Sequence, residues 1–107
     1  HRAGDFTLQH AARRISEALR ESDTVGRWGG DEFVVFLENI DREKVGDLGD
    51  KIRQAVEKPA LYGEQQLQVG ASIGHALAPD DGSMLDDLLR IADTRMYADK
   101  AARKAVR

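Results

Sequence analysis

Cysteine is absent from the 107 residues of this chain. Disulfide bonds and thiolate metal sites are therefore excluded, and the composition suits the reducing cytoplasm, where we expect the chain to work. Long apolar runs are also missing, since no stretch approaches the roughly 18 residues that a membrane helix needs. The first residues do not have the pattern of a secretory signal peptide. We therefore expect no membrane insertion of this segment.

An excess of positive charge is lacking as well, because 16 Lys and Arg residues stand against 19 Asp and Glu residues. The net charge of −3 argues against binding to a nucleic-acid polymer, which needs a basic surface. It does not exclude a small phosphorylated ligand held through a cation. The 41% of hydrophobic residues can form a core, and the length predicts one domain over residues 1–107.

Apolar residues recur at helical spacing in three segments. The pattern predicts helices over residues 6–21, 42–58 and about 84–103. Asp5 stands directly before the first of these and is a candidate N-cap. Pro59 ends the second. A turn over residues 79–82 precedes the third.

Two strands are predicted over residues 24–28 and 33–37, with Gly29 and Gly30 between them as a hairpin turn in which both accept positive φ. The run over 33–37 is apolar without alternation, which predicts a strand covered on both faces inside a sheet. Two more strands are predicted over 66–69 and 71–77. The resulting fold class is α+β, with helices packed on an antiparallel sheet.

The turn between the first two strands carries adjacent acids, Asp31 and Glu32. Two like charges about 4 Å apart repel by about 4 kcal/mol at an effective dielectric constant of about 20. The exposed amides of a glycine turn bind phosphate, and Mg²⁺ (or Mn²⁺) binds through carboxylates plus substrate phosphates. The glycines and adjacent acids at this turn therefore predict a site that binds a metal ion and a phosphate. The alternative is a common turn in which Glu32 faces water.

Residues 27–33 read RWGGDEF, which resembles the signature of the GGDEF family, the diguanylate cyclases. Other segments match that family in order: HRAGD over 1–5, ASIG over 71–74, P-x-D-G over 79–82, and AD-x-x-MY-x-x-K over 92–100. Several spaced motifs are more specific than one pentapeptide, and together they span nearly the whole chain. The resemblance implies a nucleotide-cyclase, ferredoxin-like palm fold.

The resemblance also implies an activity, the condensation of two GTP molecules into cyclic di-GMP with release of pyrophosphate. Each subunit of a homodimer would hold one GTP. Asp31 would be a metal ligand, and Glu32 would bind metal or assist deprotonation of the attacking 3′-hydroxyl. Gly29 and Gly30 would let the backbone approach the phosphates.

Two further substrate contacts follow from the same resemblance. Asp5 would accept hydrogen bonds from the guanine base, and Lys100 would reach the terminal phosphates. Each has a purely structural alternative, because Asp5 could cap a helix and Lys100 could complement a helix C-terminus.

Residues 20–23 read RESD, which taken alone is an ordinary helix end. At this distance before GGDEF, the pattern resembles the family's inhibitory product site. Arg20 would donate to a guanine edge or phosphate of cyclic di-GMP, and Asp23 would accept from the base.

Two departures from the family pattern matter. The family's first strand and helix, which carry another metal-binding aspartate and a guanine-binding asparagine, have no counterpart here. We therefore expect residues 1–107 to be the C-terminal two-thirds of a GGDEF domain, with an incomplete sheet, a partner chain in the gap, or a changed register. Second, Arg103-Lys104-Ala105 replaces the usual Gly-Arg-Asn, so Lys104 would supply only a point charge for phosphate.

The function predicted for the parent protein is a diguanylate cyclase, with unidentified sensory or EAL-type domains as neighbours. We expect the 107 residues alone to show no turnover. One alternative is an inactive module that binds cyclic di-GMP or GTP as a sensor, and another is a dimerisation domain.

Overall fold

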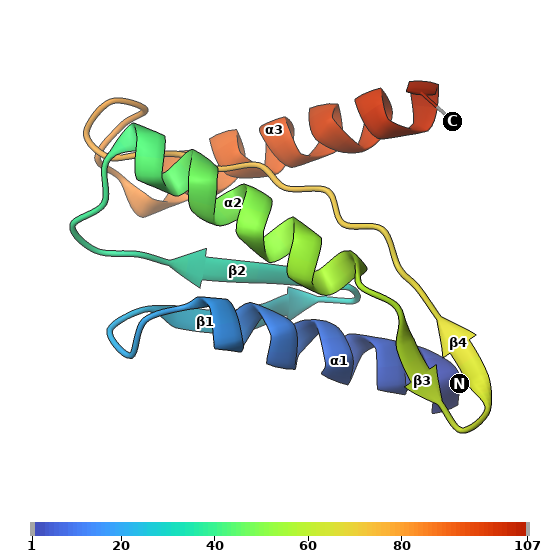
Figure 1. The fold of residues 1–107 in the computed structure, drawn as a ribbon. Helices are drawn as coiled ribbons and strands as arrows, with labels where there is room; N and C mark the ends of the chain where they lie inside the picture. The colour runs from blue at the N-terminus through green and yellow to red at the C-terminus, as the bar shows by residue number, and fades with distance from the viewer. Residues whose placement is uncertain (1, 107) are drawn as a thin grey trace.

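A computed structural model describes residues 2–106, which form an α+β arrangement of helices and short antiparallel strand pairs (Figure 1). The elements are α1 (Arg2–Ala18), β1 (Thr24–Gly29), β2 (Glu32–Phe36), α2 (Arg42–Glu57), β3 (Ala60–Tyr62), β4 (Gln65–Leu67) and α3 (Leu85–Val106). Strands β1 and β2 form one two-stranded sheet, and β3 and β4 form another. The predicted fold class is confirmed. Within residues 2–106, no helix is long and apolar enough to cross a membrane.

Helix α1 begins and ends earlier than its periodicity predicted. It starts at Arg2, so Asp5 lies inside the first turn and the predicted N-cap at Asp5 is wrong. A carboxylate in the first turn still interacts favourably with the positive end of the helix. Because the helix ends at Ala18, Arg20 lies beyond it, in the turn that leads to β1.

The β1–β2 hairpin is confirmed, but its turn is shifted by one residue. Gly30 has a φ of 50°, whereas Gly29 continues β1 and pairs with Glu32. A bulge between Arg27 and Gly29 absorbs the extra residue, so only Gly30 and Asp31 remain for the turn. Of the two glycines expected to accept positive φ, only Gly30 adopts it.

Strand β2 lies at a sheet edge in the part of the chain that the structure describes, because β1 is its only partner there. One face of the hairpin, including Phe33 and Val35, packs on a small core of Ala11, Ile15 and Val56 from α1 and α2. Phe36 remains 42% exposed. The prediction that this strand is covered on both faces is wrong, since the apolar run alone does not supply a second neighbour.

Helix α2 is confirmed, and its N-terminus is capped by Asp41, whose Oδ1 accepts a hydrogen bond of 2.8 Å from the Lys44 amide. The strand predicted over 66–69 is observed only in part, as β4, which ends at Leu67 and pairs with β3. Gly63, with a φ of 64°, opens the two-residue loop between Tyr62 and Gln65. Strand β3 was not predicted, because three residues carry too little periodicity.

The segment over residues 71–77 is extended but does not form the predicted strand. It passes between α2 and α3 (Figure 1) and has no strand beside it in residues 2–106. Three carboxylates take the place of ladder acceptors. They belong to Glu57, Asp99 and Asp81, which accept from the amides of Ala71 (3.0 Å), Ile73 (2.8 Å) and Leu77 (2.8 Å). Of the three outcomes expected for the sheet, the described residues show the incomplete one.

The turn over residues 79–82 is confirmed, since the Gly82 amide donates to the Pro79 carbonyl at 3.2 Å. Asp81 then pairs with Arg95 on α3, with 2.9 Å between Oδ1 and Nη2. Helix α3 begins one residue after its predicted start and runs three residues past its predicted end. Gly74 lies directly against its backbone, because a Cβ there would clash with Ala92 and Met96.

Candidate functional site

The tip of the β1–β2 hairpin presents the adjacent acids predicted as metal ligands. Asp31 is exposed in the turn, and Glu32 is half-buried at the start of β2. Arg27 braces the turn from β1, since its Nε donates a hydrogen bond of 2.8 Å to the Gly30 carbonyl. The tip is therefore held in shape by a strand side chain as well as by the hairpin ladder.

Tyr97 connects the tip to α3. Its hydroxyl donates to Glu32 Oε1 at a separation of 3.4 Å, a long contact between exposed groups. The negative charge of Glu32, followed by that of Asp93, raises the pKa of Tyr97, and Asp31 contributes in the same direction. Three carboxylates therefore act on one phenol, and their combined field favours a cation at this end of the hairpin.

The oxygen donors at the tip fit a hard divalent cation. Within residues 2–106, no group of three or more His, Asp and Glu side chains is arranged to hold a metal by itself. Mg²⁺ commonly binds through one or two carboxylates with the remaining ligands from water and substrate phosphates. Asp31 and Glu32 match that requirement and would need a phosphorylated substrate to complete the coordination.

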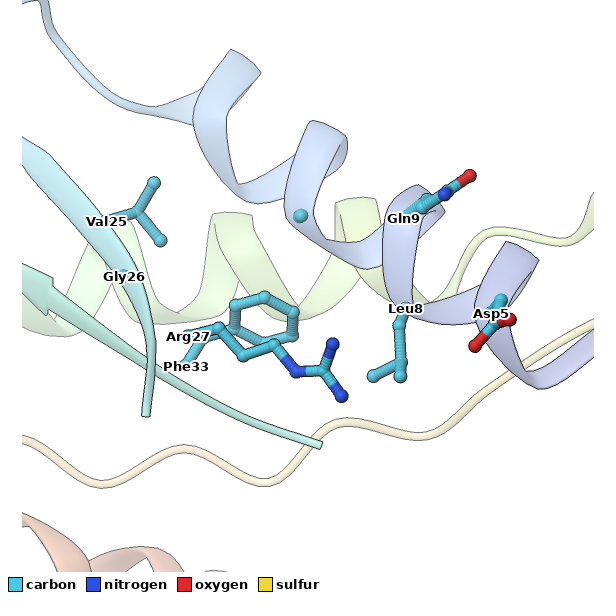
Figure 2. A pocket seen from close by; sticks show the side chains of 8 residues that line it. Asp5, Leu8, Gln9, Val25, Gly26, Arg27 and Phe33 are labelled. Atoms are coloured by element: carbon cyan, nitrogen blue, oxygen red, sulfur yellow. The ribbon is translucent and has the colours of Figure 1, made fainter. Parts of the chain in front are cut away.

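A cavity of about 290 Å³ lies between α1 and the β1–β2 hairpin (Figure 2). Its apolar lining comes from Leu8, Ala12, Val25 and Phe33, and its polar lining from Asp5, Gln9 and Arg27. Asp5 does not cap the helix, but as a first-turn residue it still complements the helix N-terminus while its carboxylate also lines the cavity. Asp5 thus lies where a ligand could contact it.

A second cavity, of about 560 Å³, lies between α3, the end of α2 and residues 70–72. Lys100 and Lys104, the predicted phosphate contacts, both line it, together with Arg103. Lys100 precedes the last turn of α3, so a role in complementing the helix end does not explain it, whereas Lys104 lies in that turn. This second cavity has more basic residues in its lining than the first.

The predicted product-site residues contact one another. Arg20 and Asp23 form an ion pair of 2.8 Å, and Asp23 also accepts a 2.8 Å hydrogen bond from the Arg20 amide. The hydrogen bond from the Arg20 side chain lowers the pKa of Asp23. The Asp23 side chain is only 1% exposed, while that of Arg20 is 52% exposed and also donates to the Glu38 carbonyl. The contacts of Asp23 are thus with its neighbour Arg20, and a role for Asp23 at a product site stays a prediction.

The predicted residues therefore lie in separate places. Asp5 lines the first cavity, and Lys100 and Lys104 line the second. The tip residues, Gly29 to Glu32, line neither cavity. The first residue of the HRAGD motif, His1, lies outside the described residues.

Sequence reasoning gave no role to two residues of this region, Arg27 and Tyr97. The sequence does contain a signal for Arg27. Val25 and Arg27 are two residues apart on β1, so they point to the same face of the strand, and both line the first cavity. Tyr97 lies three residues before Lys100 on α3, which places the two on neighbouring parts of one helix face.

Comparison with known proteins gives a consistent result. The family model "Diguanylate cyclase, GGDEF domain" matches residues 1–105. The bifunctional diguanylate cyclase/cyclic di-GMP phosphodiesterase MucR of Pseudomonas aeruginosa is 36% identical over 97 residues, which are 91% of this chain and 14% of MucR. Diguanylate cyclase A of Treponema denticola is 33% identical over 101 residues, which are 94% of this chain and 27% of that relative.

A solved structure gives the same likeness in three dimensions. An EAL/GGDEF domain protein from M. capsulatus superposes with a TM-score of 0.86 at 40% identity, over 95% of this chain and 66% of that one. The chain thus spans a small part of these curated relatives and two-thirds of that solved structure.

Proposed function

This chain belongs to the GGDEF domain family, and we propose that it is a catalytic domain that condenses two GTP molecules into cyclic di-GMP. One observation carries the proposal: adjacent carboxylates, Asp31 and Glu32, project from a braced hairpin tip beside α3. Two relatives that match most of this chain are named as diguanylate cyclases.

The proposed reaction is a phosphoryl transfer that occurs twice. The 3′-oxygen of one GTP forms a bond to the α-phosphorus of the other, and the bond from that phosphorus to the β-phosphate oxygen breaks. Pyrophosphate leaves, and the hydroxyl proton passes to a base, for which Glu32 is the proposed acceptor. Because one chain offers one set of these residues, two chains must face each other as a homodimer. Positioning and charge neutralisation account for most catalysis of this kind.

Asp31 and Glu32 would hold Mg²⁺ (or Mn²⁺), which supplies neutralisation of phosphate charge when bound. The backbone at Gly29 and Gly30 would approach the phosphates, since neither residue has a side chain to obstruct them. The cavity near Lys100 and Lys104 would receive the terminal phosphates, and Asp5 would accept from the guanine base.

Regulation and neighbouring domains are part of the proposal. The exposed guanidinium of Arg20 offers donors for cyclic di-GMP, and Asp23 holds that side chain in place. Because this chain covers 14% of MucR, we infer that the parent protein carries further domains of a sensory or EAL type.

A second candidate is a module that binds GTP or cyclic di-GMP without turnover. It is favoured by the separation of the acidic tip from both cavities and by the lack of a third metal-binding side chain beside it in residues 2–106. Binding of nucleotide without release of pyrophosphate would identify this case.

The test is an assay of the protein at its natural length with GTP and Mg²⁺, in which pyrophosphate and cyclic di-GMP are both quantified. We expect synthesis in the wild type and its loss in Asp31→Asn and Glu32→Gln. Glu38→Gln, beyond the other end of β2, is the matched control and should retain activity. Nucleotide binding without product supports the second candidate, and activity that survives Asp31→Asn removes the role given to the tip.

A further inference from the structure

The first cavity has the size and lining of a site for one planar ring system. Its volume of about 290 Å³ lies at the lower end of the range for small-molecule sites, so it would take a base rather than a whole nucleotide. Leu8 of α1 and Phe33 of β2 contribute apolar surface to it on either side of the Arg27 side chain. An aromatic side chain such as Phe33 can hold a nucleobase by stacking.

Two opposite charges line this cavity without neutralising one another. Asp5 comes from α1 and Arg27 from β1, and Figure 2 shows the guanidinium extending between Phe33 and Leu8 toward the helix. Within residues 2–106, neither group forms an ion pair of 4.0 Å or less. An unpaired acid and base on opposite walls are available to a ligand that offers donors on one edge and acceptors on another.

The position of Arg27 is fixed before any ligand binds. Its Nε donates to the Gly30 carbonyl at 2.8 Å, which leaves the two terminal Nη groups as donors for the cavity. Arg has a planar array of donors, so holding Nε also restricts the direction of the other two. The side chain is therefore preorganised to bind two adjacent acceptors.

Guanine has the complementary pattern. Its O6 and N7 are adjacent acceptors, which Arg commonly contacts with two hydrogen bonds, and its N1–H and 2-amino groups are donors for a carboxylate. Adenine presents an amino donor beside N7, which would oppose the guanidinium. The pairing of Asp5 with Arg27 thus distinguishes the two purines on both edges.

We propose that Arg27 is a specificity-determining residue that binds the O6 and N7 edge of guanine while Asp5 binds the opposite edge. Because the substrate is the GTP proposed above, this role rests on the proposed function. It also links recognition to the hairpin tip, since the same side chain holds the Gly30 carbonyl next to Asp31.

The experiment compares the binding of GTP and 7-deaza-GTP, which has a carbon in place of N7, to the protein at its natural length with Mg²⁺. Wild type should bind 7-deaza-GTP about tenfold more weakly, as expected for the loss of one hydrogen bond to a charged donor. In Arg27→Ala this difference should disappear. Asp5→Ala should retain the difference but lose the preference for GTP over inosine triphosphate, which lacks the 2-amino group.

Arg90→Ala, an exposed arginine on α3, is the matched control and should behave as wild type. Equal affinity of wild type for GTP and 7-deaza-GTP would overturn the role of Arg27 and leave the proposed function intact. That comparison needs no variant, so misfolding cannot obscure it. Equal weakening of both nucleotides by Arg27→Ala would instead show a phosphate or structural contact and would also overturn it. A wild type that binds no GTP would defeat the proposed function itself.

Discussion

Asp99 of α3 accepts a hydrogen bond of 2.8 Å from the backbone amide of Ile73, and the same Oδ2 atom also contacts Arg53 and Arg103 at 3.2 and 3.1 Å. Burial disfavours the charge of Asp99, but these donors and the two positive charges outweigh it, so the pKa of Asp99 lies below its ordinary value. One carboxylate oxygen therefore joins α2, α3 and the extended segment between them.

We predict that Asp99→Ala lowers the free energy of unfolding by about 1–3 kcal/mol, because it leaves the part-buried amide of Ile73 without its acceptor and removes one acceptor from each of two arginines, of which Arg53 keeps its contact with Asp50. Urea denaturation of wild type and variant measures the change. Asp47→Ala, at an exposed position on α2, is the matched control and should change stability by no more than about 0.5 kcal/mol. Equal stability of the Asp99 variant and the control would contradict this account.

The same substitution should have opposite effects at two glycines. Gly74→Ala should destabilise the protein strongly, because the added Cβ would meet the backbone of Ala92 and Met96 on α3. Gly46→Ala should stabilise it by up to about 1 kcal/mol, since this α2 position has open space and alanine is the better helix former. Thermal melting of both variants tests the prediction, and a harmless Gly74→Ala would show that the segment does not lie against α3.

Stability should fall as the pH drops below about 6.5 because of His10, which is 4% exposed and stacked on Phe6. Burial lowers the pKa of His10, followed by the charges of Arg14 and Arg13. The unfolded chain then binds a proton more readily than the folded one, so protonation favours unfolding until the folded pKa is reached. The contribution is fully present above pH 6.5.

The check is urea denaturation between pH 7.5 and 5 in wild type and His10→Phe. The variant should lose part of the decline seen in wild type over this range. Parallel pH dependence in wild type and His10→Phe would exclude His10 as the source.

Glu32→Gln should lower the pKa of Tyr97 toward its ordinary value of 10.0, since the charge of Glu32 is the largest cause of its elevation. Tyrosinate absorbance during an alkaline titration reports the change, and a Tyr62→Phe background leaves Tyr97 as the only tyrosine. Glu38→Gln should leave the titration unaltered. An unchanged titration in Glu32→Gln would mean that α3 does not approach the hairpin tip, whatever the protein's activity.

Arg20→Ala should relieve inhibition by cyclic di-GMP under the proposed function, because it removes the exposed donors at the product site. The measurement is the product concentration that halves the rate of pyrophosphate release, and it should rise in the variant while the initial rate without product is retained. Arg90→Ala serves again as the control. Inhibition of equal strength in Arg20→Ala would assign the product to another site.

Much of the fold could be predicted from local patterns. The apolar spacing and Pro59 defined α2, and the glycines defined the β1–β2 hairpin, whereas the Asp41 cap was found only in the structure. The errors arose where structure depends on distant partners. An apolar run such as residues 71–77 has strand propensity, but a ladder needs a neighbouring strand, and here side-chain carboxylates provide the hydrogen bonds instead.

The candidate site shows the same division. The spacing within RWGGDEF predicted an acidic hairpin tip with Asp31 and Glu32, and the structure has one. The contact of Glu32 with Tyr97 joins residues 65 positions apart, and no local period encodes it. The shared cavity of Asp5 and Arg27 likewise depends on how α1 lies over the hairpin.

The hydrogen bonds along residues 71–77 make the two edges of this extended segment different. The amides of Ala71, Ile73 and Leu77 and the carbonyl of His75, which accepts 2.9 Å from Arg95, all belong to odd-numbered residues, whose polar groups face the same way in an extended chain. Side chains therefore already occupy the hydrogen-bonding edge formed by the odd-numbered residues. A further strand would therefore have to pair with the opposite edge, which is formed by the backbone groups of Ser72, Gly74 and Ala76. The sheet can be extended from this segment on that edge alone.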